Sequence, residues 1–446
     1  MLRRFAGLRG LLSRQFASAF VSRFASSILG FATLLVASRL LTTYEYGVYV
    51  FLFSVGSALG AAAVLGQQNL VLKHYRPGEG AGAGNADLVR YNLGWLTLAL
   101  ALLLVVGIGL RLAAPALPDP YDRLHLACAF AAVFAVSEYL QSYFRIQGSI
   151  WLALLPREVV WRGASALMFC VASLFGILYG ATEAMEIVLA LFIAVTGYQI
   201  VRLADRHGSS FRRRGVRADA RNPASLVWRK ESLLFWASNT LYALVLYIET
   251  VIIGAVVGME AAAFYFVALR YATLLTLPGA AIDTVTMPLI AARFQASDRA
   301  GAQRLISLHA LGSFLISSAG AVAMILVGPF ALALFKPDFA AHTDVLLVLC
   351  LSTVVGTFFG PSGGLLMLRG GERYYLVSSA ILYGAYAVVL CGLATIWGIL
   401  GVAVANLIVT LCTNLNLARW VRARCGLDST VAGYFRPLGA PTHAAG

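Results

Sequence analysis

Charged residues are scarce in this sequence. Only 12% of its 446 residues are Asp, Glu, Lys or Arg, whereas 60% are hydrophobic, and the mean hydropathy is +0.80. A soluble domain of this length could not cover its surface with so little charge. The composition therefore excludes a soluble protein and predicts a polytopic membrane protein.

Acidic residues are rarer than basic ones. The chain has 20 Asp and Glu against 34 Lys and Arg, which gives a formal net charge of +14. In a soluble protein such an excess would favour a nucleic-acid partner. Here the basic residues lie between long apolar stretches, so they predict loops that face an anionic membrane leaflet and no nucleic-acid partner.

Sequence motifs for catalysis and metal binding are also missing. The six cysteines are scattered, without a CxxC pair or a spacing to histidine that suggests a metal site, and we expect them to be small core residues. No DxD or nucleophile motif is present, and the loops on the predicted extracytoplasmic side are short. A membrane glycan polymerase or glycosyltransferase needs catalytic residues on a sizeable loop there, so an enzyme is the weakest function class. We expect no cofactor and no metal.

Long apolar stretches make up most of the chain. Crossing a hydrocarbon core takes about 20 helical residues, and at that length the sequence divides into twelve candidate spans. The only long polar interval, Arg202 to Lys230, holds nine basic and two acidic residues. We therefore predict a basic interfacial segment over 1–17, a six-helix lobe over 18–204, a cytoplasmic linker loop over 205–230, a second six-helix lobe over 231–424 and a cytoplasmic tail over 425–446.

The basic residues also predict an orientation. With the N-terminus inside, 27 of the 34 Lys and Arg fall on the cytoplasmic side, and the opposite side receives only Arg111, Arg123 and Lys336. This bias places both termini in the cytoplasm. The two halves also match weakly, LLTTYEYGVYVFLF against AVVGMEAAAFYFVA, which sets Glu45 over Glu260. Such a parallel repeat is a common transporter plan, with the substrate between the halves.

Several segments resemble one family in their order and spacing. They are ASRLLTTYEYGVYVFLFSVG, IETVIIGAVVGMEAAAFYFVALRYATLLTLP, MPLIAARFQASDRAGAQRL, GPFALALFKPDFAAHTDVLLVLCL and LRGGERYYLVSSA followed by GILGVAVANLIVTL. The chain thus resembles the polysaccharide flippases of the multidrug/oligosaccharidyl-lipid/polysaccharide (MOP) exporter superfamily. One departure is Glu249, where relatives often have Asp. The resemblance implies a MATE-like fold in the bacterial inner membrane, a polyprenyl-linked O-antigen or exopolysaccharide unit as substrate, and a polysaccharide polymerase or assembly machinery as a possible partner.

Two arginines inside predicted spans are candidate ligands of the substrate. Arg23 shares a polar helical face with Ser26, Ser27, Gly30 and Thr33, and Arg270 lies in the corresponding region of the eighth span. A charge in hydrocarbon faces a partner or a wet cavity. Guanidinium groups suit a pyrophosphate, so we predict that Arg23, Arg270, Ser26 and Ser27 bind the carrier pyrophosphate. The alternative is that each arginine pairs with an acid for structure alone.

The acidic residues inside spans predict ion pairs and ion coupling. Glu138 shares a face with Arg145, and Glu158 shares one with Arg162, so intrahelical pairing is the favoured interpretation of both. Glu249 has no basic neighbour on its own helix. It either pairs with Arg270 or carries a coupling ion, a role for which Glu138 is the second candidate.

Breaks in the apolar spans predict bends. Pro278 can kink the eighth span, and Gly360 with Pro361 interrupts the tenth. Such a break is either a hinge for alternating access or a kink that neighbouring helices accommodate.

A flippase that translocates a polyprenyl-pyrophosphate-linked oligosaccharide by alternating access is the leading hypothesis. The second is a multidrug or cation exporter of the same superfamily, which would need an acidic cavity in place of a basic one.

Overall fold

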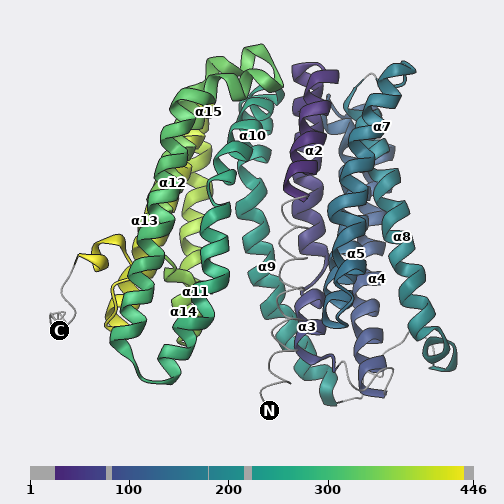
Figure 1. Ribbon diagram of the computed structural model, residues 1–446. Coiled ribbons are helices and arrows are strands. Elements are labelled where there is room, and N and C mark those ends of the chain that lie inside the picture. Colours follow the sequence, from purple (N-terminus) through teal and green to yellow (C-terminus); the bar gives the residue numbers. More distant parts are fainter. Residues whose placement is uncertain (1–25, 77–82, 179, 215–222, 436–446) are drawn as a thin grey trace. The chain divides into compact units, whose positions relative to one another are not determined.

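The computed structural model describes residues 26–76, 83–178, 180–214 and 223–435. In these ranges the regular structure is helical and contains no strand (Figure 1). The chain forms two compact units, Met1–Val251 and Ile252–Gly446. The prediction of an all-α polytopic membrane protein is therefore confirmed.

The first unit is built around α5 (Leu124–Ile146). Helices α2 (Thr43–Ala63), α3 (Gln67–His74), α4 (Ala83–Ala113) and α8 (Ala181–Arg214) all pack against it. Gly56 and Gly60 of α2 allow the closest approach, since a Cβ at either position would lie 2.9 Å from a carbonyl oxygen of α5. Small residues four apart let membrane helices approach closely in this way. Phe130 of α5 also packs against Trp161 and Phe192, whose ring centroids lie 4.3 Å apart in a stacked arrangement.

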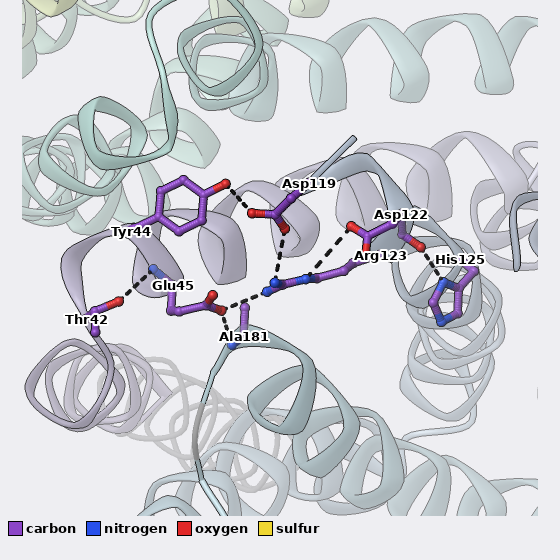
Figure 2. Close-up of polar contacts among 8 residues, drawn as sticks. All are labelled: Thr42, Tyr44, Glu45, Asp119, Asp122, Arg123, His125 and Ala181. Carbon is purple, nitrogen blue, oxygen red and sulfur yellow. Dashed lines mark hydrogen bonds and ion pairs between the residues drawn. The ribbon is translucent and has the colours of Figure 1, made fainter. Parts of the chain in front are cut away.

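A polar cluster joins the ends of three helical segments of the first unit (Figure 2). The Glu45 carboxylate, in the first turn of α2, accepts hydrogen bonds from Arg123 at 2.8 Å and from the Ala181 backbone N–H at 2.7 Å. Arg123 also bonds to Asp119 at 3.0 Å, and Tyr44 donates to the same carboxylate. An anion beside Ala181 satisfies a free amide at the start of α8. The cluster therefore fixes where α2, α5 and α8 begin.

The remaining helices of the first unit are short or interrupted. A helix over Ser26–Leu40 precedes α2. After α5 come α6 (Ile150–Leu154), the π-helix η4 (Leu155–Trp161) and α7 (Arg162–Leu174), which together replace one straight span. Short 3-10 turns, η2 (Ala114–Ala116) and η3 (Tyr121–Arg123), connect α4 to α5.

The second unit has fewer but longer helices. They are α10 (Met259–Leu274), α11 (Leu277–Gln295), α12 (Arg299–Phe335), α13 (Thr343–Phe358), α14 (Ser362–Leu368) and α15 (Glu372–Cys425), with 3-10 turns η5 (Pro337–His342) and η6 (Val431–Tyr434). Helix α13 packs against α10, α12 and α15. Helix α15 bends at Gly398, whose φ of 58° and ψ of −136° are not helical, so it serves as two spans.

The predicted number of spans agrees with these helices. In the described part of the chain, nine helices are long and apolar enough to cross a membrane. The bend in α15 divides one of them, and the helix Ser26–Leu40 and the interrupted stretch from α6 to α7 supply the others. Each of the twelve predicted spans therefore has a helical counterpart, whereas the predicted segment 1–17 lies outside the described residues.

Helix α9 (Pro223–Val256) belongs mainly to the first unit, although the sequence suggested that it begins the second lobe. Ser232 donates to the Leu65 carbonyl at 2.7 Å and accepts from Gln67 at 2.7 Å, and Glu231 pairs with Lys73 at 2.8 Å. The interval predicted as a linker loop is helical at both ends, because α8 runs to Arg214 and α9 starts at Pro223.

The start of the predicted tail packs against the second unit. Leu427, Ser429 and Val431 are buried. Burial disfavours the charged form of Asp428, but hydrogen bonds from Thr430 and Arg422 outweigh it and hold the pKa of this carboxyl below its usual range. The carboxylate therefore stays ionised at neutral pH and keeps its 2.6 Å bond to Arg422.

The segment around Ser429 packs against the helix break at Gly360. Gly360 has a φ of +62°, and a Cβ there would lie 2.3 Å from the Ser429 carbonyl oxygen and 2.8 Å from the Ala310 side chain. Beside it, the Ser362 and Ser429 hydroxyls are hydrogen-bonded at 2.8 Å. The break is thus fixed by neighbouring backbone on one side.

We predict that Gly360→Ala lowers the thermal stability of the purified protein more than Gly370→Ala does. Both glycines have positive φ, 62° and 75°, but a Cβ at Gly370 meets nothing within 4 Å. Gly370→Ala should therefore lower the free energy of unfolding by only about 1–2 kcal/mol, because alanine disfavours the left-handed backbone conformation. Gly360→Ala adds a backbone collision, and equal melting temperatures of the two variants in detergent would contradict the close packing described here.

Candidate functional site

Four charged side chains form a network inside the first unit. Arg157 of η4 donates to Glu138 of α5, and its guanidinium lies 4.5 Å from the centre of the Phe134 ring. The expectation that Glu138 pairs with Arg145 on its own helix is therefore wrong. A partner on the adjacent segment is closer because η4 turns Arg157 toward α5.

The π-helix explains this placement. Pro156 lies at the start of η4 and has no N–H to donate, which interrupts the ordinary helical ladder. Single π-turns inside α-helices are rare and often occur at functional sites. Here the wider turn brings two consecutive charged residues, Arg157 and Glu158, into the interior of the first unit.

Glu158 and Arg162 form the second ion pair of the network. The Glu158 carboxylate accepts from the Ser26 hydroxyl and lies 3.4 Å from Arg162, whose Nη1 also donates to the Ser26 carbonyl at 3.1 Å. The structure thus contains the ion pair between Glu158 and Arg162. A Cβ at Gly30 would lie 2.3 Å from Nη1 of Arg162, so the glycine lets the guanidinium lie close against this helix.

The polar face of the helix Ser26–Leu40 therefore faces η4 and α7. Thr33 extends this face, since its hydroxyl lies 2.9 Å from the Arg162 carbonyl oxygen, and Ser27 is half-buried. The two glutamates and two arginines balance one another. A balanced and mutually bonded set of charges is the arrangement that a low-dielectric interior tolerates.

The predicted pyrophosphate ligands fall in different parts of the chain. Arg23 lies outside the described residues. Arg270 is half-buried, with its guanidinium 4.5 Å from the centre of the Phe266 ring. Glu249 is only 3% exposed and lies in the first unit, whereas Arg270 lies in the second. A clamp of Arg23 and Arg270, the pairing of Glu249 with Arg270 and ion coupling at Glu249 or Glu138 stay predictions.

The second unit contains a cavity of about 470 Å³. Its walls come from α10, α11, α12, α13 and α15. The polar lining consists of seven hydroxyl side chains, one amide and one acid beside a histidine: Thr273, Thr276, Ser313, Ser352, Thr353, Thr357, Thr410, Asn406, Asp283 and His309. We call this cavity the hydroxyl pocket.

Two helix breaks lie at the hydroxyl pocket. One separates α10 from α11 next to Pro278, and the other separates α13 from α14 at Gly360 and Pro361. Pro361 has a φ of −81° and a ψ of 41°, and Gly360 is left-handed. Interrupted helices are typical of transporter binding sites, because irregular backbone at membrane depth is tolerated only where protein buries it or where it lines a cavity.

Hydrogen bonds hold the pocket's polar groups in place. Ser352 of α13 donates to Asn406 of α15 at 2.6 Å and lies 3.0 Å from the Thr410 hydroxyl. Asp283 of α11 lies 3.3 Å from the buried His309 of α12. The pairing was missed because single polar residues on different helices have no spacing that links them.

The comparisons with known proteins concern the whole chain. No protein-family model matches it, and no curated protein sequence matches it. Among solved structures, an inward-facing multidrug resistance MATE family transporter of the MOP superfamily is similar over 94% of this chain and 100% of its own, with a TM-score of 0.69 and 16% identity. A MOP superfamily transporter from Pyrococcus furiosus, described as having a binding pocket of reverse polarity that suggests a different function, is similar over 92% of this chain and 95% of its own, with a TM-score of 0.58 and 17% identity.

A third similar structure is a MATE protein in the bent conformation. It covers 91% of this chain and 93% of its own, with a TM-score of 0.57 and 16% identity. The chain is therefore a multi-pass membrane protein with the fold of the MATE transporters of the MOP superfamily, as the sequence resemblance implied.

We predict that Glu158→Gln destabilises the first unit by roughly 2–4 kcal/mol. The change leaves Arg157 and Arg162 with one carboxylate, Glu138, between them, and an uncompensated charge in a partly buried site costs about that much. The exposed Glu186 of α8 provides a matched control, since Glu186→Gln should change stability by less than about 0.5 kcal/mol. Thermal unfolding of both variants in the same detergent measures the difference. Equal stability of the two would show that the network does not hold the interrupted span.

Proposed function

We propose that this chain is a bacterial inner-membrane flippase that carries a polyprenyl-pyrophosphate-linked oligosaccharide from the cytoplasmic to the periplasmic leaflet by alternating access. The observation that carries the proposal is the hydroxyl-rich lining of the hydroxyl pocket. Sugars present closely spaced hydroxyl groups, which hydroxyl and amide side chains can match as donors and acceptors. The resemblance of the quoted sequence segments to polysaccharide flippases supports the same assignment.

The charges of the hydroxyl pocket fit a sugar better than an organic cation. A cation exporter would favour exposed carboxylates or aromatic rings for its substrate. Among the described residues that line this pocket there is no Phe, Tyr or Trp, and the only carboxylate is the half-exposed Asp283, which lies 3.3 Å from His309. Seven hydroxyl side chains and Asn406 supply the other polar contacts.

A MATE-like multidrug exporter is the second candidate, because the similar solved structures include multidrug transporters of the same fold. Another structure with this fold is described by the reverse polarity of its binding pocket and a suggested different function. The polarity of the pocket can therefore distinguish a flippase from a multidrug exporter.

The proposed orientation follows the distribution of basic residues. With both termini in the cytoplasm, the long basic interval around residues 205–230 faces the anionic leaflet on that side. A polysaccharide polymerase or other assembly machinery would accept the translocated unit. We propose no nucleic-acid partner.

The proposal is tested in a strain that lacks the gene. Polyprenyl-linked saccharides are extracted, and a membrane-impermeant probe reports which leaflet exposes the glycan. We expect complete repeat units to accumulate on the cytoplasmic side and surface polysaccharide to be lost, with drug susceptibility unchanged. Normal arrival of complete units at the outer leaflet, with increased drug susceptibility, would favour the multidrug exporter.

A single substitution in the hydroxyl pocket gives a sharper test. We predict that Asn406→Leu lowers the rate of glycan translocation about tenfold, since losing one hydrogen bond of a well-placed polar group costs roughly 1–1.5 kcal/mol. Thr395→Val is the control, because Thr395 lies on the same helix but is exposed and does not line the pocket. Equal translocation by the two variants at equal expression would remove the pocket from the substrate path.

A further inference from the structure

A second cavity lies at the surface of the first unit, away from the charged network. Its volume is about 340 Å³, and it is lined by Tyr91, Gly94, Trp95 and Leu98 of α4 and by Ser225, Leu226 and Arg229 of α9. Its lining therefore combines aromatic and aliphatic side chains with one basic residue. We call this cavity the interfacial pocket.

Aromatic packing holds Tyr91 and Trp95 of the interfacial pocket in place. The Tyr91 ring lies 5.4 Å from Trp228 and 6.4 Å from Trp95, and Tyr91 and Trp228 are buried in the same core cluster. Tyrosine and tryptophan gather where a membrane helix passes from hydrocarbon to the headgroup region. These rings indicate that the pocket lies at the level of the lipid headgroups.

Arg229 supplies the charge. Its side chain is exposed, and it forms no salt bridge within the described part of the chain. Lys230 follows it directly, and the basic interval that precedes α9 adds more positive charge. A guanidinium in this setting favours a phosphate group, to which it can donate two parallel hydrogen bonds.

An exposed apolar stripe on α4 leads away from the interfacial pocket. Leu98, Leu102 and Val105 follow at helical spacing and are 59%, 65% and 66% exposed. Half of a hydrocarbon core is about 15 Å, the length of roughly ten helical residues. An acyl chain that starts at Leu98 would therefore follow this stripe to about residue 108.

We propose that the interfacial pocket is a binding site for a phospholipid with an anionic headgroup, such as phosphatidylglycerol. The headgroup phosphate lies against Arg229 and Ser225, the glycerol region lies beside Trp95, and one acyl chain follows the stripe on α4. This site is separate from the hydroxyl pocket, and it does not depend on which substrate the protein transports.

The chain offers a matched pair of substitutions for the test. A Cβ at Gly94 meets nothing within 4 Å, so Gly94→Leu fits the fold while its side chain fills the pocket. Gly109 lies further along the same helix and is equally open, so Gly109→Leu adds the same bulk outside the pocket. Arg229→Gln removes the charge in the pocket, and Lys230→Gln removes the neighbouring charge outside it.

Native mass spectrometry of the full-length protein in detergent, with added phosphatidylglycerol or phosphatidylcholine, counts the retained lipids. We expect the unsubstituted protein to retain phosphatidylglycerol preferentially and Gly94→Leu to abolish that preference. Arg229→Gln should weaken it about fivefold, which corresponds to the contribution of one basic residue at an anionic surface. Gly109→Leu and Lys230→Gln should retain the lipid as the unsubstituted protein does.

Two results would overturn the proposal. Equal retention by Gly94→Leu and Gly109→Leu would show that the lipid binds elsewhere. Displacement of phosphatidylglycerol by equimolar undecaprenyl pyrophosphate, lost in Gly94→Leu, would assign the pocket to a polyprenyl carrier instead of a phospholipid. Neither result bears on glycan translocation in the deletion strain, so this proposal and the proposed function fail independently.

Discussion

The requirement that every polar group in hydrocarbon be satisfied within the protein governs the first unit. The interrupted span from α6 to α7 would leave backbone groups and two charged side chains in an apolar surrounding. Arg157 and Glu158 are tolerated because Glu138 and Arg162 neutralise them and Ser26 adds a hydrogen bond. The position of the helix Ser26–Leu40 follows from the same constraint, since its polar face contributes to the network and Gly30 makes room for the guanidinium. One network thus links the helix Ser26–Leu40 to α5 and to the interrupted span that follows α5.

At the helix breaks of the second unit, mostly neutral side chains meet the same requirement. Its breaks at Pro278 and Gly360 lie beside a cavity lined mostly by neutral side chains. Ser429 packs against Gly360 from outside the spans and bonds to Ser362, so the break between α13 and α14 has a fixed neighbour. Neighbouring residues thus hold the break on this side, and its role as a hinge stays a prediction. The opposite side faces the pocket, where a ligand can contact residues next to the break.

The sequence predicted the fold well because membrane spans depend on apolar length, a local property that each stretch carries by itself. It predicted the polar face of the helix Ser26–Leu40 for the same reason, since helical periodicity relates neighbouring residues. It failed where partners lie on different helices. Glu138 was paired with Arg145 because both share one helical face, and nothing in the spacing revealed the π-helix that turns Arg157 toward α5. The pairing of Asp283 with His309 and the bonds of Ser352 to α15 are of the same kind.

The contrast between apolar spans and polar contacts also explains how proteins of one fold can differ in function. Chains that share the MATE fold with under 20% identity keep the pattern of apolar spans, because the bilayer imposes it on all of them. The polar residues that line a cavity are few, and each can change without disturbing that pattern. In this chain most of them are hydroxyl and amide groups, whose fixed donors and acceptors select by shape and hydrogen bonding. Since fold does not determine function, the chemistry of this lining is the stronger argument for a sugar-containing substrate.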